Sequence, residues 1–313
     1  GRYVSGNDMA SALYVSRNAV WKAVNALKSE GHDIHAVTNK GYSLAPESSV
    51  LSKASIKKHL GAKADSFHIE VVKSVDSTNT AVKALASQGA PEGTVIAAEE
   101  QTGGRGRMGR RFYSPAGTGI YFSVLLRPLV QVLDATLITT AAAVAVASSI
   151  ETVTGTDAKI KWVNDVFCHG KKVCGILTEG AFDLESGGLE YAVLGIGINI
   201  KRPAGGYPPE ISHVAGAVFE SSAPETETKS RLIAEILAMF WDDYNNLADK
   251  AFLPEYRSRS FIIGKDVDVI MGDALRKARA VDIDDECRLV VRFADGSVEA
   301  LSSGEVSIRP NYM

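Results

Sequence analysis

The hydrophobic pattern of this chain changes twice along its 313 residues, and this change most constrains the fold. The first stretch has two short helical runs and a hairpin pattern, the long middle alternates strand-like with helical runs, and the last stretch has only short strand-like runs. One hydrophobic core rarely serves a chain of this length. We therefore expect an α+β protein with domains at residues 1–45, 66–255 and 256–313 and a linker at residues 46–65.

The first domain has the pattern of a winged helix-turn-helix. Its predicted parts are a helix over 9–13 capped by Asn7 or Asp8, a helix over 17–29 between Ser16 and Gly31, and a hairpin turning at 39–41. Winged helices normally have a leading helix, so we expect a further segment upstream of residue 1.

The second helix of such a unit enters the DNA major groove, where its first residues face the bases while the wing touches the backbone. Six side chains have this placement: Ser16, Arg17, Asn18, Trp21, Lys22 and Lys40. Operator DNA is therefore a candidate partner. The alternative is an ordinary helix pair with a solvated charged face, because a few basic residues on one helix are a weak signal and the whole chain has a net charge of −3.

The middle of the chain contains an apolar stretch over residues 137–150 that Thr and Ser residues interrupt. It is too short to span a bilayer, and no leader pattern opens the chain. The three cysteines, Cys168, Cys174 and Cys287, are few and lack paired metal-ligand spacing. We interpret the chain as a cytoplasmic protein with buried thiols, no membrane span and no metal site of its own.

Residues 103–111 form a glycine-rich basic segment between two strand-like runs. Glycine lets successive backbone N–H groups point into one concavity, and the interleaved arginines supply paired donors for a carboxylate or phosphate. The segment lacks the Gly-Lys-Ser/Thr ending of a P-loop, and no helix opens on it as in a dinucleotide-binding motif. It suits an anionic ligand; a solvated loop or an RNA-binding segment is the alternative.

Three further segments offer groups to the same site. Lys172 begins a strand-like run after Asn164-Asp165 and can act as a point charge, although Asn-Asp is also ordinary turn chemistry. The glycines of residues 194–200 mark either close approach of a flat ligand or a bulge. Residues 76–79 precede a helix, and three adjacent polar side chains exceed what one helix cap needs.

Taken in order, these segments resemble the biotin protein ligases. The matching segments are Asp76–Asn79, Gln101 with Gly104–Arg107, Ser114–Tyr121, Lys161–Asp165, Lys172–Glu179, Gly195–Asn199 and Gly304–Glu305. The resemblance implies a central ligase domain on a class II synthetase-like sheet and a C-terminal SH3-like barrel. The first domain is similar to the DNA-binding domain of the family's bifunctional repressors.

The resemblance also implies an activity. Biotin and ATP with Mg²⁺ would yield biotinyl-AMP, and the biotinyl group would pass to a lysine of a biotin carboxyl carrier domain. The adenylate would promote a homodimer that represses transcription on operator DNA. Two alternatives are a lipoate ligase, which shares this architecture, and a biotin-sensing regulator without turnover.

Residue roles follow from the resemblance alone. Biotin contacts are implied for Ser77, Thr78, Asn79, Gln101, Arg105, Gly106, Arg107, Lys172, Gly175, Gly195 and Gly197. Contacts to ATP and the adenylate are implied for Arg107, Phe112, Asn164, Lys172 and Asn199. The implied catalytic groups are Arg105, Arg107, Lys172 and Asp165, the last as a proton acceptor or as a carboxylate beside the metal.

Two positions depart from the family pattern. Val163 stands where the family usually has proline, and Phe112 stands where it usually has tryptophan. Neither change removes a charged group, so we expect altered affinity and retained activity.

Overall fold

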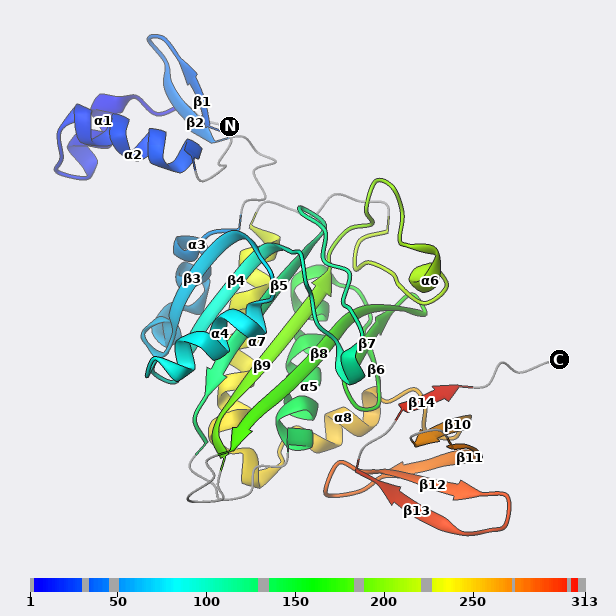
Figure 1. The fold of residues 1–313 in the computed structure, drawn as a ribbon. Coiled ribbons are helices and arrows are strands. Elements are labelled where there is room, and N and C mark those ends of the chain that lie inside the picture. Colours follow the sequence, from blue (N-terminus) through cyan, green and yellow to red (C-terminus); the bar gives the residue numbers. More distant parts are fainter. Residues whose placement is uncertain are drawn as a thin grey trace.

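The computed structural model describes residues 3–29, 34–44, 51–128, 135–182, 189–220, 227–271, 274–302 and 305–308. Figure 1 shows a small N-terminal unit in blue, a central sheet with helices, and a C-terminal group of strands in orange and red. This α+β arrangement matches the order of patterns in the sequence. The predicted helix stop at Gly31 and the motif residue Gly304 lie outside the described residues.

The N-terminal unit contains α1 (Gly6–Ala12), α2 (Arg17–Ser29), β1 (Ile34–Val37) and β2 (Gly41–Leu44). The Ser16 hydroxyl caps α2 as predicted, since it accepts a hydrogen bond from Ala19 N at 3.1 Å. The predicted cap of the first helix was wrong. The cap is Ser5, whose Oγ accepts from Asp8 N at 3.0 Å, so that α1 begins three residues before the predicted start.

A seven-stranded sheet forms the centre of the chain, in the order β3-β4-β5-β9-β8-β7-β6. Its strands are β3 (His68–Val75), β4 (Thr94–Gln101), β5 (Gly119–Leu126), β6 (Lys159–Lys161), β7 (Asp165–Cys168), β8 (Lys171–Phe182) and β9 (Leu189–Asn199). Only β3 and β4 are parallel, because α4 (Thr78–Ser87) connects them; every other neighbouring pair is antiparallel.

The two faces of this sheet are covered differently. The helices α5 (Ala135–Thr154) and α7 (Thr228–Asn245) pack on one face, and α4 packs on the other over β4, β5 and β9. By length and composition α5 could cross a membrane, yet most of it is buried against α7 and the sheet. It is apolar on all sides because it lies inside the core.

The remaining helical elements are short. They are α3 (Lys53–Leu60), η1 (Gly61–Ser66), η2 (Arg107–Gly109), α6 (Pro209–Ser212), η3 (Leu247–Asp249) and α8 (Leu253–Arg259). The predicted linker includes α3, but Leu51, Ile56 and Leu60 are buried in the main core and α3 packs on α7. This part of the linker is therefore not a free connector, and the remaining domain boundaries stay a prediction.

The C-terminal unit is a five-stranded antiparallel sheet in the order β13-β12-β11-β10-β14. Its strands are β10 (Asp266–Met271), β11 (Ala274–Ile283), β12 (Leu289–Phe293), β13 (Val298–Leu301) and β14 (Glu305–Ile308). Asp295-Gly296 forms the hairpin turn between β12 and β13, where Phe293 N donates to Ser297 O at 2.9 Å. Alternate residues of β12 are buried, as expected for a sheet with one face on a core.

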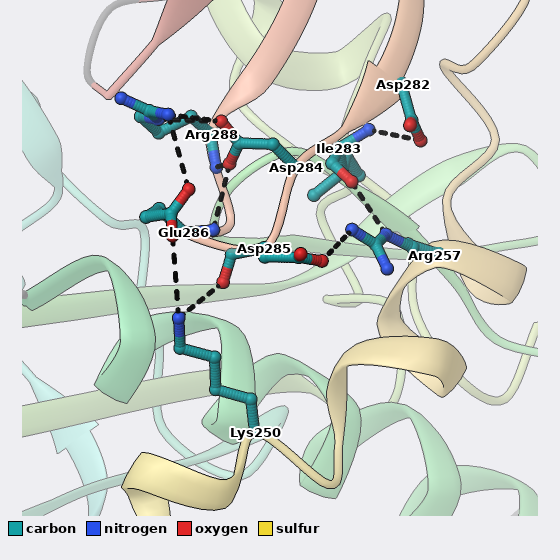
Figure 2. Close-up of polar contacts among 8 residues, drawn as sticks. All are labelled: Lys250, Arg257, Asp282, Ile283, Asp284, Asp285, Glu286 and Arg288. Carbon is teal, nitrogen blue, oxygen red and sulfur yellow. Dashed lines mark hydrogen bonds and ion pairs between the residues drawn. The ribbon is translucent and has the colours of Figure 1, made fainter.

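Polar contacts hold the turn between β11 and β12 against the central unit (Figure 2). Lys250 donates to Asp285 O at 2.7 Å, and Arg257 donates to Ile283 O at 2.6 Å and to the Asp285 carboxylate at 2.8 Å. The buried Trp162 indole donates to Cys287 O at 2.9 Å. Trp162 lies between β6 and β7, so this bond ties the C-terminal sheet to the predicted site.

Replacing Trp162 by phenylalanine should test this tie. Trp162→Phe leaves the Cys287 carbonyl buried without its indole donor, so we expect a loss of about 1–3 kcal/mol in the free energy of unfolding. Urea denaturation followed by circular dichroism measures this loss. The matched control is Trp21→Phe, because Trp21 is 55% exposed and should change the stability little. Equal stability of the two variants would contradict the expectation.

Candidate active site

A cavity of about 270 Å³ opens on the face of the central sheet that α4 covers. Residues that alternate along β9 show which face this is, since Tyr191 and Val193 pack with α4 while Leu194 and Ile196 belong to the opposite core. All fifteen predicted ligand and catalytic residues line it: Ser77, Thr78, Asn79, Gln101, Arg105, Gly106, Arg107, Phe112, Asn164, Asp165, Lys172, Gly175, Gly195, Gly197 and Asn199.

Three glycines form the floor of this cavity. Gly175 and Gly197 are paired across β8 and β9, and Gly195 lies two residues before Gly197 on the same face. A Cβ at Gly197 would lie 2.6 Å from the Phe112 ring and one at Gly175 would lie 3.1 Å from it, whereas a Cβ at Gly195 would overlap Asn79 Oδ1. Glycine is therefore required by space and not by backbone conformation.

The first turn of α4 forms one wall. Ser77, Thr78 and Asn79 are buried there, and Ser77 occupies the cap position without a side-chain cap bond. The cap comes from β4 instead, because Gln101 Oε1 accepts from Thr78 N at 2.9 Å and from Thr78 Oγ1 at 3.1 Å. Gln101 Nε2 in turn donates to Ser114 Oγ at 3.0 Å, so both ends of the amide are fixed.

The basic loop closes over the cavity in a compact form. Gly106 N donates to Arg110 O at 2.8 Å, and Phe112 N donates to Gly104 O at 2.9 Å. Arg107 donates to Asn164 Oδ1 at 3.0 Å, which connects the loop to the segment between β6 and β7. Phe112 lies edge-on to Tyr121 with ring centroids 6.3 Å apart. Arg105 and Arg107 thus line the same cavity as Asn164 and Asp165 of the Lys161–Asp165 segment.

Lys172, at the start of β8, and Asp165, the first residue of β7, form an ion pair of 2.6 Å. Both side chains are partly buried, at 28% and 20% exposed. The Lys172 backbone is held by a neighbouring segment, since its N–H donates to Val214 O at 2.8 Å and its carbonyl accepts from Gly216 N at 2.9 Å. Lys172 is therefore a positioned cation whose charge Asp165 partly balances.

The segment Lys161–Asp165 has Val163 where the family usually has proline, as the sequence indicated. Val163 follows Trp162 through a cis peptide bond, and the buried Tyr256 hydroxyl donates to Val163 O at 3.1 Å. Asn164 Nδ2 donates to Ile176 O at 3.0 Å, so its amide oxygen is left to accept from Arg107. The segment is thus held by hydrogen bonds to α8, to β8 and to the basic loop.

Sequence reasoning missed several groups around the site. Glu179 bonds to Asn79 at 2.8 Å and to Lys83 at 2.6 Å, and Tyr207 donates to Gly216 O at 2.8 Å beside Asn199. Burial alone would raise the pKa of Glu179, but the hydrogen bonds from Lys83 and Asn79 hold it below its usual value. The signal for Lys83 was its position one helical turn after Asn79.

Outside the cavity, the predicted DNA-contacting residues are all exposed. They are Ser16, Arg17, Asn18, Trp21, Lys22 and Lys40. Such exposure is required of side chains that reach into a groove. The cysteines are buried free thiols, as predicted, and burial raises the pKa of Cys168 to about 12. In the described part of the chain, no cluster of three His, Cys, Asp or Glu residues could hold a metal ion.

Known families match each part of the chain in order. The models are the HTH domain over residues 1–43, the Biotin/lipoate A/B protein ligase family over residues 71–199 and the Biotin protein ligase C terminal domain over residues 262–309. These matches and the glycine-floored basic pocket define an α+β protein with a helix-turn-helix domain, a ligase sheet and an SH3-like C-terminal sheet.

Full-length relatives agree with these matches. The chain is 32% identical over 309 residues to the bifunctional ligase/repressor BirA of Bacillus spizizenii, which covers 98% of this chain and 94% of that protein. It is 27% identical to the BirA of Escherichia coli over 99% of this chain and 94% of that one. The chain belongs to the biotin protein ligase family, in its bifunctional ligase/repressor branch.

A solved structure of the family has the same fold. It is the biotin protein ligase from Aquifex aeolicus in complex with biotin and ATP, with a TM-score of 0.65 and 26% sequence identity. The similarity covers 77% of this chain and 98% of that chain.

The glycine floor yields a direct prediction. Gly195→Ala should displace the Asn79 amide and weaken ligand binding about tenfold, because a new methyl group in a filled space costs roughly 1–3 kcal/mol. Calorimetric titration with biotin measures the change. The matched control is Gly205→Ala, since a Cβ there meets nothing within 4 Å. Unchanged binding by Gly195→Ala would show that the floor is not in contact with the ligand.

Proposed function

We propose that this chain joins biotin to ATP as biotinyl-AMP, transfers the biotinyl group to a lysine of a carrier domain, and represses transcription. The observation that supports the ligase activity best is the meeting of Arg105, Arg107 and Lys172 at one cavity. They come from segments more than sixty residues apart in the sequence. Three cations above a floor without side chains suit a flat, neutral ring system with an anionic end.

In the proposed first step, the biotin carboxylate attacks the α-phosphorus of ATP and pyrophosphate leaves. Two anions must approach one another, so the site has to neutralise charge and fix their orientation. Ser77, Thr78 and Asn79 at the start of α4 would bind the polar ring of biotin over the glycine floor. Arg105 would hold the biotin carboxylate, Arg107 and Lys172 would hold the carboxylate and the α-phosphate, and further cationic charge would stabilise the transition state.

The adenine end would lie toward Phe112 and Asn199. The Phe112 ring is the nearest aromatic surface above the glycine floor, and Asn164 links Arg107 to the same region. With phenylalanine in place of tryptophan the stacking surface is smaller, so we expect weaker binding of ATP with the chemistry intact.

In the proposed second step, the ε-amine of the acceptor lysine attacks the carbonyl carbon of the mixed anhydride and AMP leaves. The amine must be neutral to attack, and Asp165 is the carboxylate in the cavity that could take up its proton. Asp165 is ion-paired with Lys172 at 2.6 Å.

Magnesium would enter with ATP. The described residues provide no ready-made cage for it, and Mg²⁺ is commonly held by substrate phosphates with one or two carboxylates. Asp165 is the carboxylate in the cavity that suits this role. The ion would supply positive charge to the phosphates when bound.

A lysine pair offers a sharp test of the ligase activity. Lys172→Met should lower the rate of biotinyl-AMP formation by about 10²–10³-fold, because it removes a cation placed at the developing charge. Pyrophosphate release with biotin, ATP and Mg²⁺ measures this rate. The control is Lys171→Met, whose ammonium group donates to His213 O at 2.6 Å and does not line the cavity.

Three outcomes separate the alternatives. Adenylate formation that lipoate supports better than biotin would identify a lipoate ligase. Tight binding of biotin without pyrophosphate release would identify a sensor without turnover. Transfer of radiolabelled biotin to an isolated biotin carboxyl carrier domain would support both steps of the proposed ligase reaction.

For the repressor activity we propose that biotinyl-AMP favours a homodimer which binds a palindromic operator. The exposed start of α2 supports this proposal, since a dimer would present two such helices to successive major grooves. A double variant, Arg17→Ala with Lys22→Ala, should weaken operator binding by about ten- to hundredfold. Lys28→Ala, in the last turn of α2, is the control.

Gel-shift assays with and without biotin and ATP measure this binding. We expect a shifted band that requires both small molecules and is lost in the double variant. Binding of equal strength without them would remove the link between the adenylate and repression.

A further inference from the structure

Glu179 of β8 lies behind the cavity wall, where it meets groups from two other elements. Its Oε2 accepts a hydrogen bond from Asn79 Nδ2 at 2.8 Å. Its Oε1 accepts from Lys83 Nζ at 2.6 Å and lies 3.3 Å from an Arg105 guanidinium nitrogen. Asn79 and Arg105 line the cavity, whereas Glu179 and Lys83 do not.

The orientation of the Asn79 amide depends on this carboxylate. On one side the Ser123 hydroxyl donates to Asn79 Oδ1 at 2.6 Å, so that oxygen is the acceptor end. On the other side Glu179 is an acceptor only, and it fixes the nitrogen as the donor end. Gly195 leaves just enough room for the amide between them. The Leu177 carbonyl also accepts from Asn79 Nδ2, at the longer distance of 3.4 Å. An ionised Glu179 is therefore the closer of two acceptors that select one orientation, and a neutral side chain at this position would weaken the selection.

Arg105 is held differently. Its side chain is half exposed, and its carboxylate partner is shared with Lys83, which is 31% exposed and closer. One carboxylate between two cations leaves a net positive charge of one at this point of the rim. Arg105 thus has a defined place without being neutralised, and it remains able to attract the anionic end of a substrate.

Lys83 sets the strength of this hold. It lies four residues after Asn79, so both side chains extend from the same face of α4 toward β8. Removing Lys83 would leave Arg105 as the remaining cation on Glu179 and would pull the loop more tightly to the wall. Removing the carboxylate would release Arg105 and Asn79 together.

We propose that Glu179, balanced by Lys83, is a positioning residue that orients Asn79 and Arg105 for biotin. This inference rests on the proposed ligase function and deepens it, because it assigns biotin affinity to a pair of residues outside the cavity.

Two variants and a control test the proposal on the full chain. Glu179→Gln should raise the KM for biotin about tenfold while the KM for ATP stays within about twofold, since the loss is confined to the biotin end. Lys83→Met should raise the KM for biotin by about threefold. The control is Glu299→Gln, which breaks a 2.7 Å ion pair with Arg276 in the C-terminal unit.

Limited trypsin digestion gives a readout independent of activity. Cleavage after Arg105, followed by mass spectrometry without ligand, should be faster in Glu179→Gln and slower in Lys83→Met than in the wild type. A pair that only stabilised the fold would change cleavage in the same direction in both variants. Thermal unfolding checks that each variant is folded, and Lys83→Met serves alone if Glu179→Gln does not fold.

The outcomes distinguish this inference from the proposed function. Wild-type protein that neither binds nor activates biotin would overturn both. Active wild type with an unchanged biotin KM in Glu179→Gln, or with equal rises in the KM values for biotin and ATP, would overturn the positioning role alone.

Discussion

The structure of the site depends on one packing constraint. Where β8 and β9 pair, the face of the sheet that α4 covers lacks side chains. Gly175 and Gly197 face each other across the antiparallel pair, and Gly195 continues the same face. The neighbouring strand β5 is buried along all eight residues, and most of these are apolar. The three glycines interrupt that pattern and create a hollow inside an otherwise filled core. Because strand residues alternate, a one-residue shift in register would place the glycines in the opposite core and close the hollow.

The polar groups of the site then follow from what borders this hollow. Asn79 and the Phe112 ring occupy the space that Cβ atoms would take, so α4 and the basic loop can both approach the sheet closely. Glu179 on β8 meets α4 and the loop at their shared boundary, and Arg107 reaches Asn164 on the other side. The cations are therefore fixed by neighbours that themselves depend on the sheet register. The positions of these charges are a consequence of packing, because the same arginines on a free loop would be surrounded by water and would have no fixed place.

The sequence predicted the elements well because their signals are local. Alternation and helical periodicity predicted the mixture of strands and helices in the middle of the chain, and the glycine and Asn-Asp segments identified residues that line the cavity. The signals that failed depend on distant partners or on equivalent choices. Asn7, Asp8 and Ser5 are all good capping residues, so nothing local chose Ser5. The helix α3 has the composition of a connector, and its burial depends on α7, which lies far along the chain. The pairing of Lys83 with Glu179 spans 96 residues, and no periodic pattern encodes it.

The C-terminal sheet supports the site through the segment that joins β6 to β7. Trp162 donates to Cys287 O in the turn between β11 and β12, and Tyr256 of α8 donates to Val163 O. Asn164 directly follows Trp162 and Val163 in the chain. Since Asn164 also accepts from Arg107, the position of the basic loop depends on contacts made by the C-terminal unit. Val306 of β14 lines the cavity as well. The turn that Lys250 and Arg257 hold in place is therefore part of the support of the active site, although none of its residues touches the cavity. A small sheet at the end of the chain can thus affect catalysis by fixing where a cation lies, without supplying a reacting group itself.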